Sequence, residues 1–210
     1  MTGILAIDTA SERFALAWQD ATGVLRTLLS EEARDHSRQL IPAIERITDG
    51  AAASIEAIIV ITGPGSYAGL RVGIATAEGL ALSRTVPVFG VGTMEAAAGN
   101  EPTEGDWTII HPVGRGDFAV QMWRDGAPAG DIHIAHGDEL SGPQLKGEGA
   151  GPLGGIEVGP AARAAFAVAL RREAIARGDA PAGVEAFYIR EPHITRPRRA
   201  AMGAGRPETT

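Results

Sequence analysis

The first thirty residues alternate between short, largely apolar runs and turn-forming residues. The apolar runs lie at residues 4–7, 14–18 and 24–29, and Asp, Thr, Ser and Gly concentrate in the two segments between them. Turns this short join antiparallel neighbours, because a parallel pair needs a crossover of a dozen residues or more. Three strands in an antiparallel meander are therefore predicted.

The period of the apolar pattern then changes from that of strands to that of helices. Leu40, Ile44 and Ile47 recur at helical spacing, and Asp35 or Ser37 is placed to cap the helix. The elements expected after it are a buried β-branched strand at 58–61, a long helix at about 66–83, a strand at 86–91 and a short helix at 94–98. A meander followed by two parallel crossover units is the order of the α/β actin-like ATPase superfamily, which has a ribonuclease-H-like core.

The pattern is weaker in the second half of the chain, beyond a polar linker at residues 100–105. The expected elements there are a hairpin at 107–113 and 118–123, a strand at 132–134, a helix at 161–176 ended by Gly178, and a strand-like run at 187–189. Residues 137–160 are rich in Gly and Pro and predict no clear element. We therefore expect two tandem lobes, residues 1–104 and a shortened lobe at 105–210, with a mobile basic tail from about residue 196.

Composition narrows the classes of function. The formal net charge of −7 disfavours RNA binding by this chain alone. If RNA is involved, a partner protein would supply most of the positive electrostatic field. Without cysteine, disulfides, thiolate metal sites and cysteine nucleophiles are excluded. No stretch approaches the ~20 apolar residues of a membrane span, and the N-terminus lacks the layout of a secretory signal. A cytoplasmic protein without membrane association is expected.

The glycine-rich turn at residues 63–73 follows a strand and opens a helix, where backbone amides could hold an anion. A Walker loop is excluded because the only lysine, Lys146, lies far away, and the glycine spacing does not fit a dinucleotide fingerprint. In the helix, Gly69, Gly73 and Ala77 form a smooth stripe at four-residue intervals. The stripe suits close packing either on this protein's own sheet or against a partner.

Candidate catalytic groups find simpler interpretations. Asp8 and Thr9 stand where the superfamily places its first phosphate loop, but Asp8 is better explained as capping its own turn. They are kept only as a weak, vestigial nucleotide site. Ser66 fits a helix N-cap better than a nucleophile. His36 has no histidine one helical turn away, and His133 and His136 would point to opposite faces of a strand, so no metal or catalytic residue is predicted.

Several segments carry a resemblance to a known family. The run GPGSYAGLRVGIATAEGLA at residues 63–81 and the opening ILAIDTA at 4–10 closely resemble the bacterial TsaB (YeaZ) family. HSRQLIP at 36–42, PVFGV at 87–91 and FYIREP at 187–192 are similar to its first helix, next strand and closing strand. The likeness is dense over residues 1–100 and thin from 105 to 180.

The resemblance implies a non-catalytic scaffold subunit in the machinery that forms N6-threonylcarbamoyladenosine next to the anticodon of ANN-decoding tRNAs. The implied partners are a TsaD-like paralogue that carries the metal and the transfer site, a TsaE-like ATPase, and tRNA through the complex. No cofactor is expected on this chain, since ATP and metal belong to the partners, and the chain alone could form a homodimer. The residues to which a partner interface is carried over are His36, Leu40, Ile44, Gly69, Leu70, Gly73 and Ala77.

Two other readings stay open. The chain could be an independent actin-like nucleotide-dependent enzyme or a metallopeptidase. No complete adenosine loop of the Gly-Gly-x-x-x-Asn kind supports the first, and no histidine pair supports the second. The arginines of the tail, Arg196, Arg198, Arg199 and Arg206, could contact tRNA phosphates or could form an ordinary solvated end.

Overall fold

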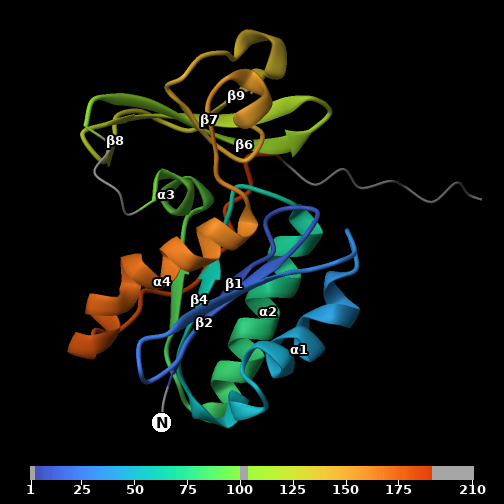
Figure 1. Cartoon of the computed structure of the whole chain (residues 1–210), viewed down its shortest axis with the longest axis vertical. Helices are drawn as coiled ribbons and strands as arrows, with labels where there is room; N and C mark the ends of the chain where they lie inside the picture. Colours follow the sequence, from blue (N-terminus) through green and yellow to red (C-terminus); the bar gives the residue numbers. More distant parts are fainter. Residues whose placement is uncertain (1–2, 100–103, 191–210) are drawn as a thin grey trace, which may run out of the picture.

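The computed structural model describes residues 3–99 and 104–190, which form two lobes stacked along the long axis of the molecule (Figure 1). The first lobe is a sheet with helices on both faces. The second lobe is a six-stranded sheet without a long helix of its own. The expected tail from residue 196 lies outside the described residues.

The first lobe contains the predicted meander with its two crossover units. Its strands are β1 (Gly3–Asp8), β2 (Ala15–Gln19), β3 (Leu25–Leu29), β4 (Ile55–Ile61) and β5 (Val88–Val91). They lie in the order β3-β2-β1-β4-β5. β1 pairs antiparallel with β2 and parallel with β4, and β4 pairs parallel with β5. This arrangement confirms the α/β actin-like fold, with its ribonuclease-H-like core, that the order of elements predicted.

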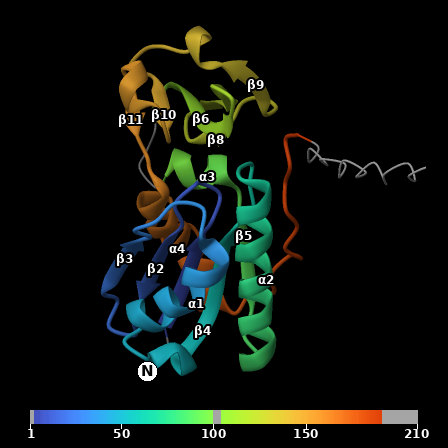
Figure 2. The ribbon, with the colours of Figure 1, turned by 90° about the vertical axis from the view of Figure 1, so that its right-hand side faces the viewer.

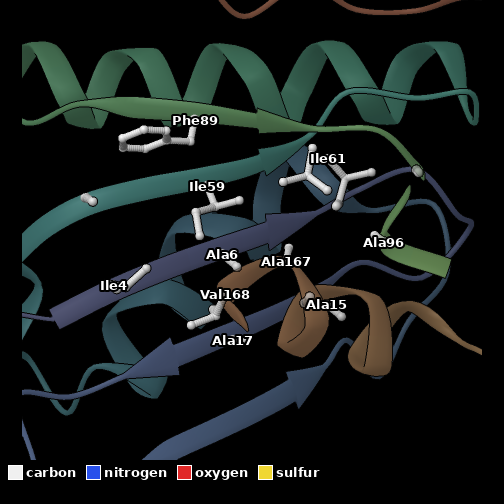
Figure 3. Packing of buried hydrophobic residues seen from close by; sticks show 14 of the residues in the cluster. Ile4, Ala6, Ala15, Ala17, Ile59, Ile61, Phe89, Ala96, Ala167 and Val168 are labelled. Carbon is white, nitrogen blue, oxygen red and sulfur yellow. The ribbon is translucent and has the colours of Figure 1, made fainter. Parts of the chain in front are cut away.

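Helices cover both faces of the first sheet. They are α1 (His36–Ile47) and α2 (Tyr67–Arg84) on one face, and α4 (Pro160–Arg177) with the short α3 (Thr93–Ala98) on the other, with a 3₁₀ turn at Ala51–Ser54 before β4. Successive side chains of each strand point to opposite faces of the sheet, because a strand has a two-residue period. Leu5 and Ile7 pack towards α1 and α2, whereas Ile4 and Ala6 pack towards α4 (Figure 3).

The second sheet includes the predicted hairpin and three short strands that the sequence did not predict. Its strands are β6 (Asp106–Gly114), β7 (Asp117–Arg124), β8 (Ala127–Pro128), β9 (His133–His136), β10 (Leu145–Gly147) and β11 (Ile156–Glu157), with 3₁₀ turns at Gly137–Glu139 and Gly151–Leu153. The three strands that were not predicted are β8, β10 and β11. β10 and β11 fall in the Gly- and Pro-rich stretch; β10 pairs parallel with β6, and β11 pairs parallel with β10. Strands of three and two residues are too short to show a period.

Two features differ from the expectation. The helix α4, assigned by its sequence position to the second lobe, packs on β1 and β2 of the first sheet. The run 187–189 is not a strand; it contributes one backbone hydrogen bond, from Phe187 N–H to the Thr62 carbonyl at 2.7 Å. Figure 2 shows this last described segment beside α2, and the ring of Tyr188 packs at a tilt against that of Tyr67, with ring centroids 4.7 Å apart.

Within the described residues, none of the helices combines the length and the apolar character that a membrane crossing would require.

Candidate functional site

A cavity of about 980 Å³ opens between the two lobes. Its walls come from the turn after β1 (residues 10–13), the start of α2 (65–68), the end of β6 (111–114), Glu148 and the last described residues, 188–190. The cavity therefore lies where the two halves of the chain meet, with Asp8 and Thr9 immediately before its first wall residue.

Asp8 and Thr9 are both fully buried, with none of their surface exposed. Oδ1 of Asp8 accepts the Ala10 N–H at 3.0 Å, which confirms that this carboxylate caps its own turn. Oδ2 of Asp8 accepts a hydrogen bond from Arg163 Nε at 2.8 Å. Both carboxylate oxygens are thus engaged inside the protein. Neither residue lines the cavity, so the vestigial nucleotide site predicted for Asp8 and Thr9 has no open face.

Arg163 is the centre of a buried polar network that the sequence analysis missed. Its side chain, on α4, is completely buried. Besides Asp8, it donates from Nη2 to Ser11 Oγ at 2.6 Å and from Nη1 to Glu148 Oε2 at 2.7 Å. Ser11 also donates to the same Glu148 oxygen. Burial would lower the pKa of Arg163, but the charges of Asp8 and Glu148 raise it above its ordinary value.

One signal in the sequence could have pointed to this network. Arg163 lies on the face of α4 that carries Ala164, Ala167 and Val168, all of them buried. An arginine on a buried alanine face requires an acidic partner, because an unpaired charge in a core is strongly unfavourable. The sequence contains no indication of which carboxylates lie nearby, since Asp8 is 155 positions away.

His111 lies beside the network, on β6, with 1% of its surface exposed. Burial, together with the neighbouring positive charge of Arg163, lowers its pKa well below the ordinary value of 6.5. The imidazole is therefore neutral at pH 7, and its 3.6 Å approach to Glu148 is not an ion pair at that pH. Burial also lowers the pKa of His36, whose ring lies against Phe14.

The geometry at Asp8 does not fit a divalent cation. Such an ion would need free oxygen donors from this carboxylate, directly or through water. Here one oxygen is used by the turn and the other by the Arg163 guanidinium, whose positive charge repels a cation. Across residues 3–99 and 104–190, no group of three or more His, Cys, Asp or Glu side chains is placed to hold a metal ion.

The residues expected at a partner interface are corrected by the structure. Leu40, Ile44, Leu70 and Ala77 are core residues with at most 2% of their surface exposed, and His36 is 8% exposed. Their helical spacing reflects burial against this chain's own sheet. His36 differs from the others in that it also lines the interlobe cavity.

The Gly69–Gly73–Ala77 stripe packs inside the monomer. A Cβ atom on Gly69 would lie 2.1 Å from the Thr9 carbonyl oxygen, and one on Gly73 would lie 2.2 Å from Thr9 Oγ1. The stripe therefore lets the turn after β1 approach α2 closely, which is one of the two packings that the sequence left open. At the start of the same helix, Ser66 Oγ accepts the Gly69 N–H at 3.2 Å, which confirms Ser66 as the N-cap.

The outer faces of α1 and α2 do carry exposed apolar side chains. Leu82 is 86% exposed and Ile41 is 44% exposed, while Ala75 and Gly79 lie on the exposed side of α2. These positions are neighbours in sequence of the buried residues named above. The helices identified from the sequence thus have an accessible face, but it is made of different residues.

Comparison with known proteins gives three kinds of match. A family model described as TsaD, tRNA N6-adenosine threonylcarbamoyltransferase, matches residues 27–110. The tRNA threonylcarbamoyladenosine biosynthesis protein TsaB of Escherichia coli is 38% identical over 99 residues, which cover 45% of this chain and 42% of that protein. The chain thus spans less than half the length of the curated TsaB relatives from Escherichia coli and Bacillus subtilis.

Longer matches include the second half of the chain. An uncharacterized protein of Mycobacterium tuberculosis is 31% identical over 153 residues, covering 70% of this chain and 72% of that protein. The structure of YeaZ from Pseudomonas aeruginosa superposes with a TM-score of 0.70 at 21% identity, covering 90% of this chain and all of that one. With the same fold, and with TsaB sequences matching its first lobe, the chain belongs to the TsaB (YeaZ) family.

Proposed function

We propose that this chain is a non-catalytic subunit in the formation of N6-threonylcarbamoyladenosine in tRNA. The proposal is supported by the names of its TsaB relatives, which place those proteins in threonylcarbamoyladenosine biosynthesis, and by the TsaD family model that matches residues 27–110. The chain would bind and support a TsaD-like paralogue, with a TsaE-like ATPase as a further partner.

One observation carries the non-catalytic part of the proposal. The carboxylate of Asp8, at the position where the superfamily holds its metal, is ion-paired with Arg163 and fully buried. A chain that uses this carboxylate structurally lacks the usual ligand for a magnesium-bound nucleotide. We therefore assign the ATP and the metal ion of the reaction to the partner subunits, and no cofactor to this chain.

We further propose that the TsaD-like partner docks on the outer faces of α1 and α2. Leu82 and Ile41 would supply apolar contact, and the small Ala75 and Gly79 would allow close approach of a partner helix. In the absence of the partner, the same face would pair two copies of this chain, since a C2 interface uses one patch twice.

Reconstitution tests the proposed function. The chain is combined with TsaD-like and TsaE-like proteins of the same organism, tRNA, ATP and a preformed, activated threonylcarbamoyl donor, and threonylcarbamoylation is measured by mass spectrometry of the nucleosides. We expect modified adenosine only when this chain and both partners are present. Unchanged modification without this chain would refute the proposal.

The same experiment separates the alternative functions. ATP hydrolysis by the isolated chain would favour an independent nucleotide-dependent enzyme, and peptide hydrolysis would favour the metallopeptidase. Asp8→Asn is the matched variant for the first case, because it removes the carboxylate that a working phosphate site would need. Hydrolysis that survives this substitution would come from a contaminating enzyme.

A further inference from the structure

We infer that Arg163 is a built-in cation that links the two lobes in place of a metal-bound nucleotide, so that they keep one arrangement with or without ATP. The inference concerns the isolated chain and does not depend on the proposed partners. It rests on the buried ion-pair network around Arg163 and on the lobes to which its members belong.

The network joins the two lobes at one guanidinium group. Asp8 and Ser11 belong to β1 and the turn after it, in the first lobe, and α4 holds Arg163 on the same sheet. Glu148 follows β10 in the second lobe. The bond from Arg163 Nη1 to Glu148 at 2.7 Å, and the bond from Ser11 to the same oxygen, therefore cross from one lobe to the other.

The charges of the network suit a permanent bridge. The positive guanidinium lies between two carboxylates, one fully buried and the other with 25% of its side chain exposed. Arginine keeps its charge at every accessible pH, and its planar fork of donors fixes the direction of each partner. A metal–nucleotide bridge exists only when the ligand is bound, whereas a side-chain cation is always present.

Other contacts between the lobes lie around this centre. Lys146 Nζ of β10 donates to the Ala98 carbonyl of α3 at 2.6 Å, and Arg190 pairs with Asp117. The Arg190–Asp117 pair is partly exposed, with 38% and 21% of the two side chains accessible. Arg163 differs from it in being wholly buried and in contacting both lobes through its own nitrogen atoms.

Distance measurement between the lobes tests the inference. The chain has no cysteine, so Thr27→Cys in β3 and Asp131→Cys in the loop before β9 give two exposed labelling sites, one in each lobe and both outside α1 and α2. Spin labels there report the interlobe distance by double electron–electron resonance. We expect a single narrow distance in the labelled parent protein, unchanged by saturating magnesium and ATP.

Variants of the bridge provide the comparison. Arg163→Met removes the cation, and Glu148→Gln weakens the link to the second lobe while leaving the buried Asp8–Arg163 pair in place. Both should lose the single narrow distance. Arg177→Met is the matched control, because Arg177 lies on the same helix in exposed ion pairs, and it should keep the parent distance.

The inference would be overturned by either of two results. One is a shift of the parent distance when magnesium and ATP are added, together with saturable ATP binding by calorimetry. The other is a parent-like narrow distance in the folded Glu148→Gln protein and in Arg163→Met. If Arg163→Met does not fold, Asp8→Asn/Arg163→Met restores charge balance in the buried site and replaces it in the comparison.

Discussion

Glycine at positions 69 and 73 is required by contacts inside the monomer, whereas Gly79 of the same helix is not. A Cβ on Gly69 would meet the Thr9 carbonyl at 2.1 Å, and nothing lies within 4 Å of a Cβ on Gly79. We expect Gly69→Ala to lower the free energy of unfolding by about 1–3 kcal/mol, or more if the turn cannot move. Gly79→Ala should raise it by about 0.5–1 kcal/mol, because alanine favours the helix.

Urea unfolding of the two variants beside the parent protein measures this difference. Equal stability of Gly69→Ala and Gly79→Ala would contradict the packing of the stripe on Thr9. A Gly73→Leu variant, which would suit a test of a partner-facing stripe, should instead disrupt the monomer, because the Cβ position is already 2.2 Å from Thr9 Oγ1.

His111 makes stability depend on pH. Its pKa in the folded protein lies well below the ordinary 6.5, so from about pH 6.5 downwards the unfolded state binds a proton that the folded state does not. The free energy of unfolding should therefore fall as the pH is lowered through this window, by up to about 1.4 kcal/mol per pH unit for this one group. His36, whose pKa burial also lowers, acts in the same direction.

Urea titrations at pH 7.5, 6.5 and 5.5 measure how steeply the free energy of unfolding changes with pH. His111→Gln should reduce this slope by the contribution of one bound proton. His133→Gln, on the exposed strand β9, controls for removal of a histidine from the surface. A wild-type slope in His111→Gln would show that folding does not lower the pKa of this imidazole.

At the residue scale, the sequence predicted local chemistry but not long-range contacts. The caps formed by Asp8 and Ser66 depend on atoms two and three positions away, and both predictions are confirmed. The Arg163 network joins residues up to 155 positions apart, and no local pattern encodes those distances. The sequence left open whether the stripe faces this chain or a partner, because small residues mark any close approach, including one within the same chain.

At the scale of the element, α2 has two faces with different roles. Its inner face packs on the sheet and on Thr9, and its outer face carries Leu82 with 86% of its surface exposed. We expect Leu82→Glu to weaken capture of the TsaD-like partner strongly while leaving the thermal midpoint of the chain unchanged. The reason is that a buried charge at an interface centre is unfavourable, whereas an exposed helix position tolerates it.

Leu25→Glu is the matched control for that experiment. Leu25 is 41% exposed but lies on β3, at the edge of the first sheet and away from α2. Pull-down with a tagged partner and thermal unfolding of each variant give the two readouts. Equal loss of capture by both variants would show that general surface acidity, and not the outer face of α2, decides binding.

The elements themselves were largely predictable, for a physical reason. In the first lobe, strands buried on both faces and amphipathic helices impose periods that the sequence shows directly. The hairpin of β6 and β7 followed from the same signals. In contrast, β10 depends on the edge of β6 and β11 on the edge of β10, and the segment at 187–189 lies against Thr62 without forming a ladder. Such structure depends on the neighbours and leaves little trace in a short sequence.

At the scale of the whole molecule, Lys146 forms a hydrogen bond that connects the two lobes. Its ammonium group is buried and donates to the carbonyl of Ala98, at the end of α3. We expect Lys146→Met to lower the free energy of unfolding by about 1.5–3 kcal/mol, the usual contribution of a hydrogen bond from a charged group. Thermal and urea unfolding beside the parent protein measure the loss, and an unchanged midpoint would mean that the lobes do not rely on this contact.

Lys146 also makes separation of the two lobes measurable by proteolysis. Lys146 is the single lysine of a 210-residue chain and has 6% of its surface exposed. An endoprotease specific for lysine therefore has one cleavage point, hidden where the second sheet meets α3. The rate at which the intact chain divides into two fragments reports how often that junction separates, without any label. If partner binding stabilises this contact between the lobes, cleavage at Lys146 should be slower in the complex than in the free chain, as followed by gel electrophoresis.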